Sequence, residues 1–188
     1  IIPGAAATDA YSKEAILSAS EDYDHQLNVT GDGIMGYIEI PNISVNLPIY
    51  HGTDESVLQI AVGHIGGSSL PVGGTGTHSV LSGHRGLSSA KLFTDLDKLA
   101  DGDVFILRIL DETLSYEVDQ ILTVLPEQTE SLGITDGDDY VTLVTCTPYA
   151  VNTHRLLVRG HRVPMKAAKA VQKTEKKVTG ITNPTLPM

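Results

Sequence analysis

The sequence predicts a mainly β fold: a closed or nearly closed barrel with a few short helices. Short runs rich in β-branched residues recur along residues 37–163, and Gly, Pro, Asn or Asp separates each run from the next. Only two brief stretches of helical composition interrupt these runs. Many short strands at hairpin spacing, with few helices, favour a barrel over a sheet built from βαβ units.

The N-terminal segment, residues 1–32, precedes the predicted barrel. Within it, Asp9–Gln26 has a helix-forming composition and apolar residues near helical spacing. The segment Asn28–Gly33 has turn chemistry and marks where the main domain begins. We therefore predict a helical segment that leads into a barrel domain over residues 33–164.

Seven strands are predicted in the barrel domain, each bounded by turn residues. In chain order they are Tyr37–Ile40, Val45–Tyr50, Ser79–Ser82, Val104–Leu110, Leu114–Val124, Tyr140–Thr145 and Arg155–Val163. Asp111–Thr113 lies between two of these runs and indicates a hairpin. Ser56–Val62 and Lys91–Leu99 are predicted to be short helices. The glycine-rich segments Gly63–Gly67 and Gly73–Gly76 lack the context of a phosphate loop and are predicted to be flexible loops near the substrate groove.

The composition excludes several classes of protein. Of the 188 residues, 41% are hydrophobic, too many for a disordered chain, and no run reaches the ~18 apolar residues of a membrane span. Residues 1–164 have 8 basic and 22 acidic side chains, a net charge of −14, which disfavours binding to nucleic acid. Residues 165–188 carry a net charge of +4. This basic tail is either a solvated helix end or a segment that faces anionic lipid headgroups beside a membrane.

The lone thiol, Cys146, is the first candidate for chemistry. It follows the strand-like run Tyr140–Thr145, and Pro148 soon stops the ladder because it has no N–H to donate. Such a strand end holds the sulfur rigidly where a substrate can reach it. As the single cysteine, it forms no internal disulfide and no cysteine-rich zinc site. The alternative is a small buried hydrophobe, since free Cys is among the most buried residue types.

His84 and Arg155 are the other two candidates. His84 follows the predicted strand Ser79–Ser82 in the sequence Ser-Gly-His-Arg-Gly, and the two glycines let the chain turn sharply. Arg155 begins a strand nine residues after Cys146, and a hairpin return along the cysteine strand would bring it back beside the thiol. Strand alternation places His154 on the other face, so His154 and Arg155 cannot both face the thiol.

These three residue types supply the parts of a nucleophilic acyl transfer. A thiolate needs a cationic or basic neighbour that lowers its pKa, and acyl transfer needs a donor aimed at the developing oxyanion. His84 would protonate the leaving amine and deprotonate the incoming one, while Arg155 would hold the substrate carbonyl or oxyanion. Thr145, directly before Cys146, is left out of the catalytic set because alternation points it away from the thiol's face.

The sequence around these residues resembles the sortases. Thr142–Tyr149 resembles the TLxTC signature that holds their catalytic Cys, Ser82–Gly86 the segment of their catalytic His, and Asn152–Gly160 the segment of their catalytic Arg. The resemblance spans residues 33–163 and also covers the sequences GYIEIP and AKLFTDLD. Among sortases the chain is most similar to class C, the pilin-polymerising enzymes of Gram-positive bacteria.

The resemblance implies an eight-stranded sortase barrel with catalytic residues at His84, Cys146 and Arg155. It implies that Cys146 attacks the Thr–Gly carbonyl of an LPXTG-like sorting signal, and that an acceptor Lys of a neighbouring pilin subunit resolves the thioacyl enzyme into an isopeptide bond. No metal or organic cofactor is implied. The enzyme would be tethered to the outer face of the cell membrane through segments absent from this chain.

The resemblance also implies an N-terminal lid. Class C enzymes commonly carry an Asp-Pro-aromatic tripeptide over the active site, and Asp9-Ala10-Tyr11 resembles it with Ala in place of Pro. In that arrangement Asp9 would pair with Arg155 while Tyr11 covers the sulfur of Cys146. The alternative is that Asp9 caps the start of a helix.

Other functions remain open from the sequence. A sortase that anchors proteins to the cell wall would use the same three residues with a different amine. A thiol protease would use Cys146 for hydrolysis, and a non-catalytic barrel adhesin or scaffold would keep it as core filler. Ion sites are disfavoured, because Asp136–Asp139 lacks the remaining ligands of a calcium loop and His78 with His84 lacks a third zinc ligand.

Overall fold

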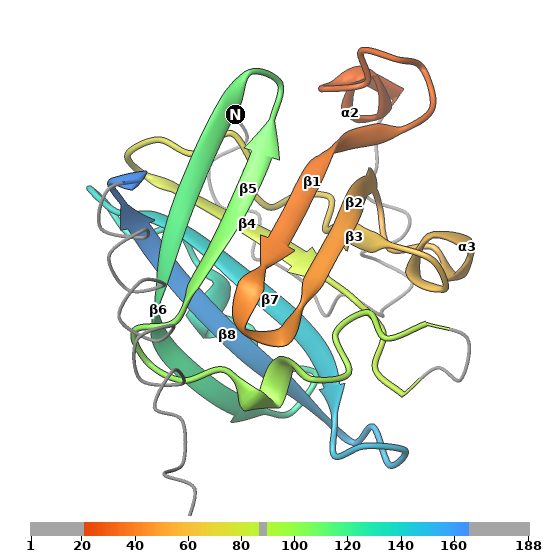
Figure 1. The fold of residues 1–188 in the computed structure, drawn as a ribbon, viewed down its shortest axis with the longest axis vertical. Helices are drawn as coiled ribbons and strands as arrows, with labels where there is room; N and C mark the ends of the chain where they lie inside the picture. Colours follow the sequence, from red (N-terminus) through yellow and green to blue (C-terminus); the bar gives the residue numbers. More distant parts are fainter. Residues whose placement is uncertain (1–20, 87–89, 166–188) are drawn as a thin grey trace, which may run out of the picture.

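Eight strands close into a barrel in the computed structural model, which describes residues 21–86 and 90–165 (Figure 1). The strands are β1 (Ile34–Ile40), β2 (Val45–His51), β3 (Val62–His64), β4 (Thr77–Ser82), β5 (Val104–Ile109), β6 (Glu112–Val124), β7 (Asp139–Thr147) and β8 (His154–Val163). Their order around the barrel is β1-β2-β3-β4-β7-β8-β6-β5, and β5 closes the ring by pairing with β1. The predicted fold class is confirmed.

The described helices are short and lie outside the strands of the barrel. They are α2 (Glu21–His25), α3 (Glu55–Leu58) and the 3-10 helices η1 (Pro41–Ile43), η2 (Leu96–Lys98) and η3 (Glu130–Leu132). Only the end of the predicted helix Asp9–Gln26 lies within the described residues, and Glu21–His25 is helical there. The predicted helix Ser56–Val62 is shorter than expected, because the chain leaves α3 after Leu58 to form β3.

The predicted helix Lys91–Leu99 is helical only over its last part, in η2. The segment consists of turns that end in η2, and its Phe93 N–H donates to the carbonyl oxygen of His84 at 3.1 Å. Phe93 and Leu96 are fully buried, and the Phe93 ring packs against the backbone at Gly83. This tertiary packing outweighs the weak helical pattern of the segment.

The strand missing from the seven predicted ones is β3. It has three residues and contains Gly63, so neither its length nor its composition marks it as a strand. β3 pairs parallel to β2 and antiparallel to β4. A side chain at position 63 would collide with the carbonyl oxygen of Gly52, so the close approach of the two backbones requires glycine.

The strand register brings three chain segments to one end of the barrel. β4 and β7 are parallel neighbours with Ser82 opposite Val144, so the residues that follow both strands emerge at the same end. β8 returns antiparallel along β7 and begins at this end, with Arg155 opposite Cys146.

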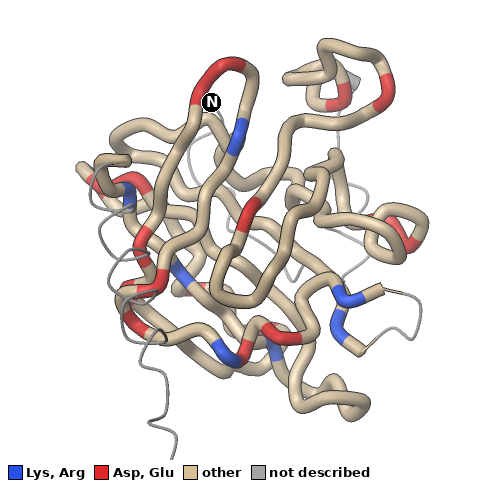
Figure 2. The backbone as a smooth tube through the Cα atoms, in the orientation of Figure 1, with Lys and Arg blue, Asp and Glu red and all other residues tan. Residues whose placement is uncertain are grey.

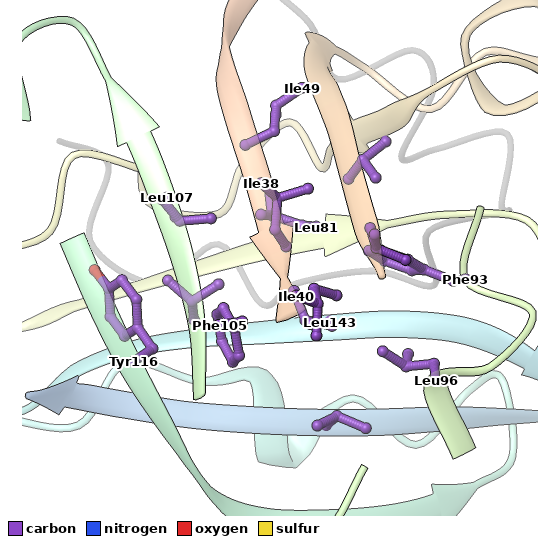
Figure 3. Packing of buried hydrophobic residues seen from close by; sticks show 14 of the residues in the cluster. Ile38, Ile40, Ile49, Leu81, Phe93, Leu96, Phe105, Leu107, Tyr116 and Leu143 are labelled. Carbon is purple, nitrogen blue, oxygen red and sulfur yellow. The ribbon is translucent and has the colours of Figure 1, made fainter. Parts of the chain in front are cut away.

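One large hydrophobic cluster fills the barrel (Figure 3). Phe105 and Tyr116 stack within it, with their ring centroids 5.6 Å apart, and both lie against Gly160. Burying each side chain of this size contributes about 1.5–3 kcal/mol relative to leaving it exposed. A second, smaller cluster involves the opposite face of β4, β7 and β8, together with η3. Its members are Ile65, Val80, Leu132, Val144 and Leu157.

Acidic residues occur along many of the strand connections and strand ends, with fewer basic residues among them (Figure 2). Among the helices of the described residues, none combines the length and the hydrophobicity needed to cross a membrane. Asp9, Tyr11 and the basic tail beyond Met165 lie outside the described residues.

Candidate active site

Cys146 lies at the end of β7, one residue before the strand stops. As the single cysteine of the sequence it forms no disulfide within the chain, and its side chain is partly buried. The preceding residue, Thr145, is fully buried, and its hydroxyl donates to the carbonyl oxygen of Gly83 at 2.8 Å. Successive side chains of a strand point to opposite faces, so Thr145 faces away from the sulfur, as alternation predicts. The strand end therefore presents the sulfur on a hydrogen-bonded, rigid backbone.

Arg155 is the cross-strand partner of Cys146 in the antiparallel β7–β8 pair. Such partners lie on one face with their Cβ atoms about 4.5–5.5 Å apart, so the guanidinium extends from the same face as the sulfur. Its Nη1 donates to the carbonyl oxygens of Asn152 and His154, each at 3.3 Å. His154 itself pairs with Thr147 and takes the other face. The predicted hairpin return of Arg155 to the thiol is confirmed.

His84 follows the end of β4 by two residues. Continuing the parallel register of Ser82 opposite Val144 by two residues places His84 level with Cys146. The Gly83 N–H supports this placement by donating to the Val144 carbonyl oxygen at 3.1 Å. The structure therefore brings His84, Cys146 and Arg155 to the same end of the barrel, on neighbouring parts of the sheet.

A carboxylate that the sequence did not single out, Glu55, contacts the His84 imidazole. His84 Nε2 lies 3.2 Å from Glu55 Oε2, with side-chain exposures of 19% for the histidine and 69% for the glutamate. Hydrogen bonds from Gln59 and from His84 lower the pKa of Glu55, which begins α3. Glu55 escaped notice because it is 29 residues away from His84 and belongs to no catalytic motif.

A small apolar groove lies beside Arg155 on the outer face of the barrel. The end of β6, the chain after it, η3, β7 and β8 all contribute to it. Its lining residues are Ile65, Val124, Leu125, Pro126, Gln128, Thr129, Leu132, Val144, Arg155 and Leu157. The lining is mostly aliphatic, with Arg155 as its single charged side chain. Ile65, Val144 and Leu157 in this lining are buried members of the second hydrophobic cluster, so the groove exposes only a narrow aliphatic edge beside Arg155.

Only one of the two glycine-rich segments lies near this groove. Gly63 and His64 form part of β3 and are buried, and Ile65 then lines the groove. The prediction for Gly73–Gly76 is wrong. Gly74 N–H donates to Asp139 Oδ2 at 2.8 Å, at the start of β7, which places this loop at the opposite end of the barrel from Cys146. Seven residues of strand separate the two ends by roughly 23 Å.

The other polar residues considered for ion binding have partners within the fold. His78 is buried, with Nδ1 2.8 Å from the Gly133 carbonyl oxygen and Nε2 2.7 Å from the Thr142 hydroxyl, and burial lowers its pKa. Asp138 accepts a hydrogen bond from the Tyr140 hydroxyl at 3.0 Å. Within residues 21–86 and 90–165, no group of three His, Cys, Asp or Glu side chains could hold a metal ion.

Comparison with known proteins adds independent information on the family. Residues 38–163 match the sortase domain family. The chain is 34% identical to sortase A of Streptococcus agalactiae over 151 residues, which are 78% of this chain and 58% of that protein. It is 30% identical to sortase A of Bacillus anthracis over 136 residues, or 72% and 63% of the two chains. The chain thus spans about three fifths of the length of these curated relatives.

Solved structures of sortases described as sortase C share the fold and much of the sequence. Sortase C-1 from Actinomyces oris is 52% identical, with a TM-score of 0.81 over 86% of this chain and 90% of that one. Sortase C1 from Streptococcus agalactiae is 55% identical, with a TM-score of 0.75 and coverages of 83% and 86%. The pilus-related sortase C of Group B Streptococcus is 45% identical, with a TM-score of 0.77 and coverages of 85% and 80%.

The fold is a closed eight-stranded barrel. A thiol, a guanidinium and an imidazole lie at one end of it, so the chain is a β-barrel protein with a cysteine-centred site. The family match and the sequence identities show which family this protein belongs to. The chain belongs to the sortase family, and its structural neighbours include sortases of class C.

Proposed function

We propose that this protein is a cysteine transpeptidase in which Cys146, His84 and Arg155 are the catalytic residues. The observation that carries the proposal is the strand register: β8 sets Arg155 opposite Cys146, and the parallel β4–β7 pair brings His84 level with the same sulfur. In this proposal a nucleophile, a proton carrier and a permanently charged donor act on one substrate carbonyl.

In the first half-reaction, the Cys146 thiolate attacks the carbonyl carbon of the Thr–Gly bond in an LPXTG-like sorting signal. Arg155 donates hydrogen bonds to the oxyanion that forms. The C–N bond breaks as the protonated His84 gives its proton to the departing glycine amine. The products are a Cys146 thioester with the threonine and a released C-terminal fragment.

In the second half-reaction, an amine replaces the thiol. A neutral Lys amine of a pilin subunit attacks the thioester carbonyl, His84 accepts the proton, and the C–S bond breaks to restore the thiolate. The new amide joins threonine to the Lys side chain as an isopeptide bond. The support for this substrate class comes from the sortase family match, and the residues beside Arg155 are aliphatic, as an apolar residue next to the reacting carbonyl would require.

Two acceptors distinguish the leading function from its nearest alternative. Class C structural neighbours, one of them described as a pilus-related sortase C, support a pilin Lys as the acceptor. The curated relatives described as sortase A support the alternative of anchoring surface proteins to the cell wall. In either role we place the protein at the Gram-positive cell surface. Asp9 and Tyr11 are proposed to form a lid over the thiol.

Incubation with an LPXTG-type peptide, with and without a pilin that carries an acceptor Lys, tests the proposal. Wild-type protein is expected to build ladders of pilin, and Cys146→Ala to build none while keeping its thermal midpoint. Arg155→Lys keeps a charge but loses the planar fork, so we expect a loss on the order of 10²-fold in kcat, typical of a lost oxyanion donor.

The alternatives give different products. Peptide hydrolysis alone, with or without pilin, would indicate a thiol protease. Transfer to a small cell-wall-type amine but not to pilin would indicate anchoring. The absence of any Cys146-dependent cleavage, together with a thiol that resists alkylation, would leave the scaffold role and refute the enzymatic proposal.

A further inference from the structure

Arg85, directly after His84, is a nearly buried cation. Its side chain is 8% exposed. One terminal nitrogen, Nη2, forms an ion pair with Asp97 in η2, and the other, Nη1, donates to the Thr147 hydroxyl at 3.2 Å. Thr147 is the residue after Cys146 and the last of β7. A single side chain therefore joins the loop that carries His84 to the strand that carries Cys146.

This bridge lies where the backbone ladder between the two segments has ended. The last pair of the β4–β7 ladder is Ser82 opposite Val144, and the Gly83 N–H adds one further bond to β7. Beyond His84, the contact from Arg85 to Thr147 continues the connection between the two segments. The chain on both sides of His84 is thus tied to β7, by a backbone bond at Gly83 before it and by the Arg85 guanidinium after it.

Stability alone does not account for a buried arginine here. Removing a guanidinium from water is costly, and apolar side chains of similar volume usually serve a fold as well or better. The Nε of Arg85 is also buried without a hydrogen-bond partner among the described residues. What an aliphatic side chain could not supply is a planar fork that contacts two groups at fixed angles.

We propose that Arg85 is a positioning residue, whose bridge between Asp97 and Thr147 sets the placement of the His84 imidazole relative to the Cys146 thiol. This inference rests on the proposed catalytic roles of His84 and Cys146. Arg85 itself touches neither substrate nor reacting atom. Because a misplacement of about 1 Å can cost 10²-fold in rate, loss of the bridge should affect the chemical step more than substrate binding.

The test compares Arg85→Lys, which keeps the charge without the fork, with Thr147→Val, which removes one hydroxyl at nearly constant volume. For both variants we expect kcat on the LPXTG-type peptide to fall at least tenfold, on the order of the effect of a small misplacement, while KM changes less than about twofold. The pH profile of Cys146 alkylation should shift for both as well, because the reactivity of a thiol depends on where a neighbouring basic side chain lies. The double variant should be no worse than Arg85→Lys, since both changes break one bridge.

Arg159→Lys is the matched control. Arg159 lies on β8, away from the thiol. Its Nε and Nη2 donate to the two carboxylate oxygens of Asp119 at 2.9 and 3.1 Å, and both side chains are partly buried. The Arg159→Lys variant should lose as much thermal stability as Arg85→Lys but keep the wild-type kcat and the wild-type pH profile of alkylation. Equal effects of the two Arg→Lys variants on kcat, or unchanged kcat and profile in both Arg85→Lys and Thr147→Val, would overturn the proposal. If Arg85→Lys does not fold, Thr147→Val decides alone.

His84→Ala separates a failure of this inference from a failure of the proposed function. If His84→Ala leaves the alkylation profile unchanged, the imidazole does not act on the thiol, and the assigned catalytic site is itself wrong. If His84→Ala shifts the profile but Arg85→Lys and Thr147→Val do not, the catalytic site stands and the bridge is structural only.

Discussion

Lowering the pH is expected to destabilise the barrel through one buried imidazole, that of His64. The residue lies in β3 with no exposed surface. Its Nδ1 is 2.6 Å from the Tyr23 hydroxyl and its Nε2 is 2.8 Å from the carbonyl oxygen of Ser69. A neutral ring satisfies both contacts when Nε2–H donates to the carbonyl and Nδ1 accepts from Tyr23. Burial lowers the pKa of His64 from its ordinary 6.5 to about 4.

The sign and size of the effect follow from that difference. Between pH 6.5 and about 4, the unfolded chain binds a proton at His64 that the folded chain does not, so the free energy of unfolding decreases as the pH falls. The full contribution is present above pH 6.5 and is lost by about pH 4. At about 1.4 kcal/mol for each pKa unit, the lowering of the His64 pKa corresponds to a loss of about 3 kcal/mol.

Urea unfolding at a series of pH values measures this loss, with His64→Gln as the test variant. We expect His64→Gln to be less stable than wild type at pH 7 but to lose about 3 kcal/mol less on acidification. Carboxylates titrate in both proteins and cancel in the comparison. Val62→Ala, in the same strand, should be destabilised without any change in pH dependence. Parallel curves for wild type and His64→Gln between pH 6.5 and 4 would refute the reasoning.

Three further predictions follow from particular contacts. Tyr23→Phe should lower the free energy of unfolding by about 1–3 kcal/mol in urea titration, because the buried His64 Nδ1 loses its donor; an unchanged midpoint would contradict this. Gly160→Ala should cost about 1–3 kcal/mol by the same measurement, since a Cβ there would lie 2.7 Å from the Phe105 ring; a neutral effect would mean that the ring yields. Tyr11→Ala should raise the rate of Cys146 alkylation if the proposed lid covers the thiol, and an equal rate would count against the lid.

The elements that the sequence predicted well are those with long, regular patterns. The β6 strand, Glu112–Val124, includes the predicted run from Leu114, and β7 and β8 also agree closely with prediction. Errors arose where packing outweighed local pattern. Lys91–Leu99 has helical composition, but burial of Phe93 holds its first half in turns, and only η2 is helical. β3 could not be predicted from the sequence, because a three-residue strand that contains glycine depends on its neighbouring strands on both sides for its hydrogen bonds.

The candidate site likewise contains residues that the sequence reveals and residues that it does not. Cys146, His84 and Arg155 lie in recognisable local motifs, and the hairpin relation between the first and last can be read from nine residues of separation. Glu55 and the Asp97–Arg85 pair carry no such signal. Glu55 contacts His84 across 29 positions of the sequence, and Asp97 contacts Arg85 across 12 positions. Only the closed sheet brings these positions together.

The family of the fold and the geometry of the site thus depend on different physical interactions, the first on local ones and the second on long-range ones. Local alternation, turn residues and three short motifs are sufficient for a β-barrel of the sortase family, because backbone preferences and motif chemistry act over a few neighbouring positions. The parallel β4–β7 pairing, the direction of each side chain at the barrel's end, and the bridge from Arg85 to Asp97 and Thr147 depend on which distant strands share hydrogen bonds. Such long-range pairing is settled by the packing of the whole core, so only the tertiary structure decides it.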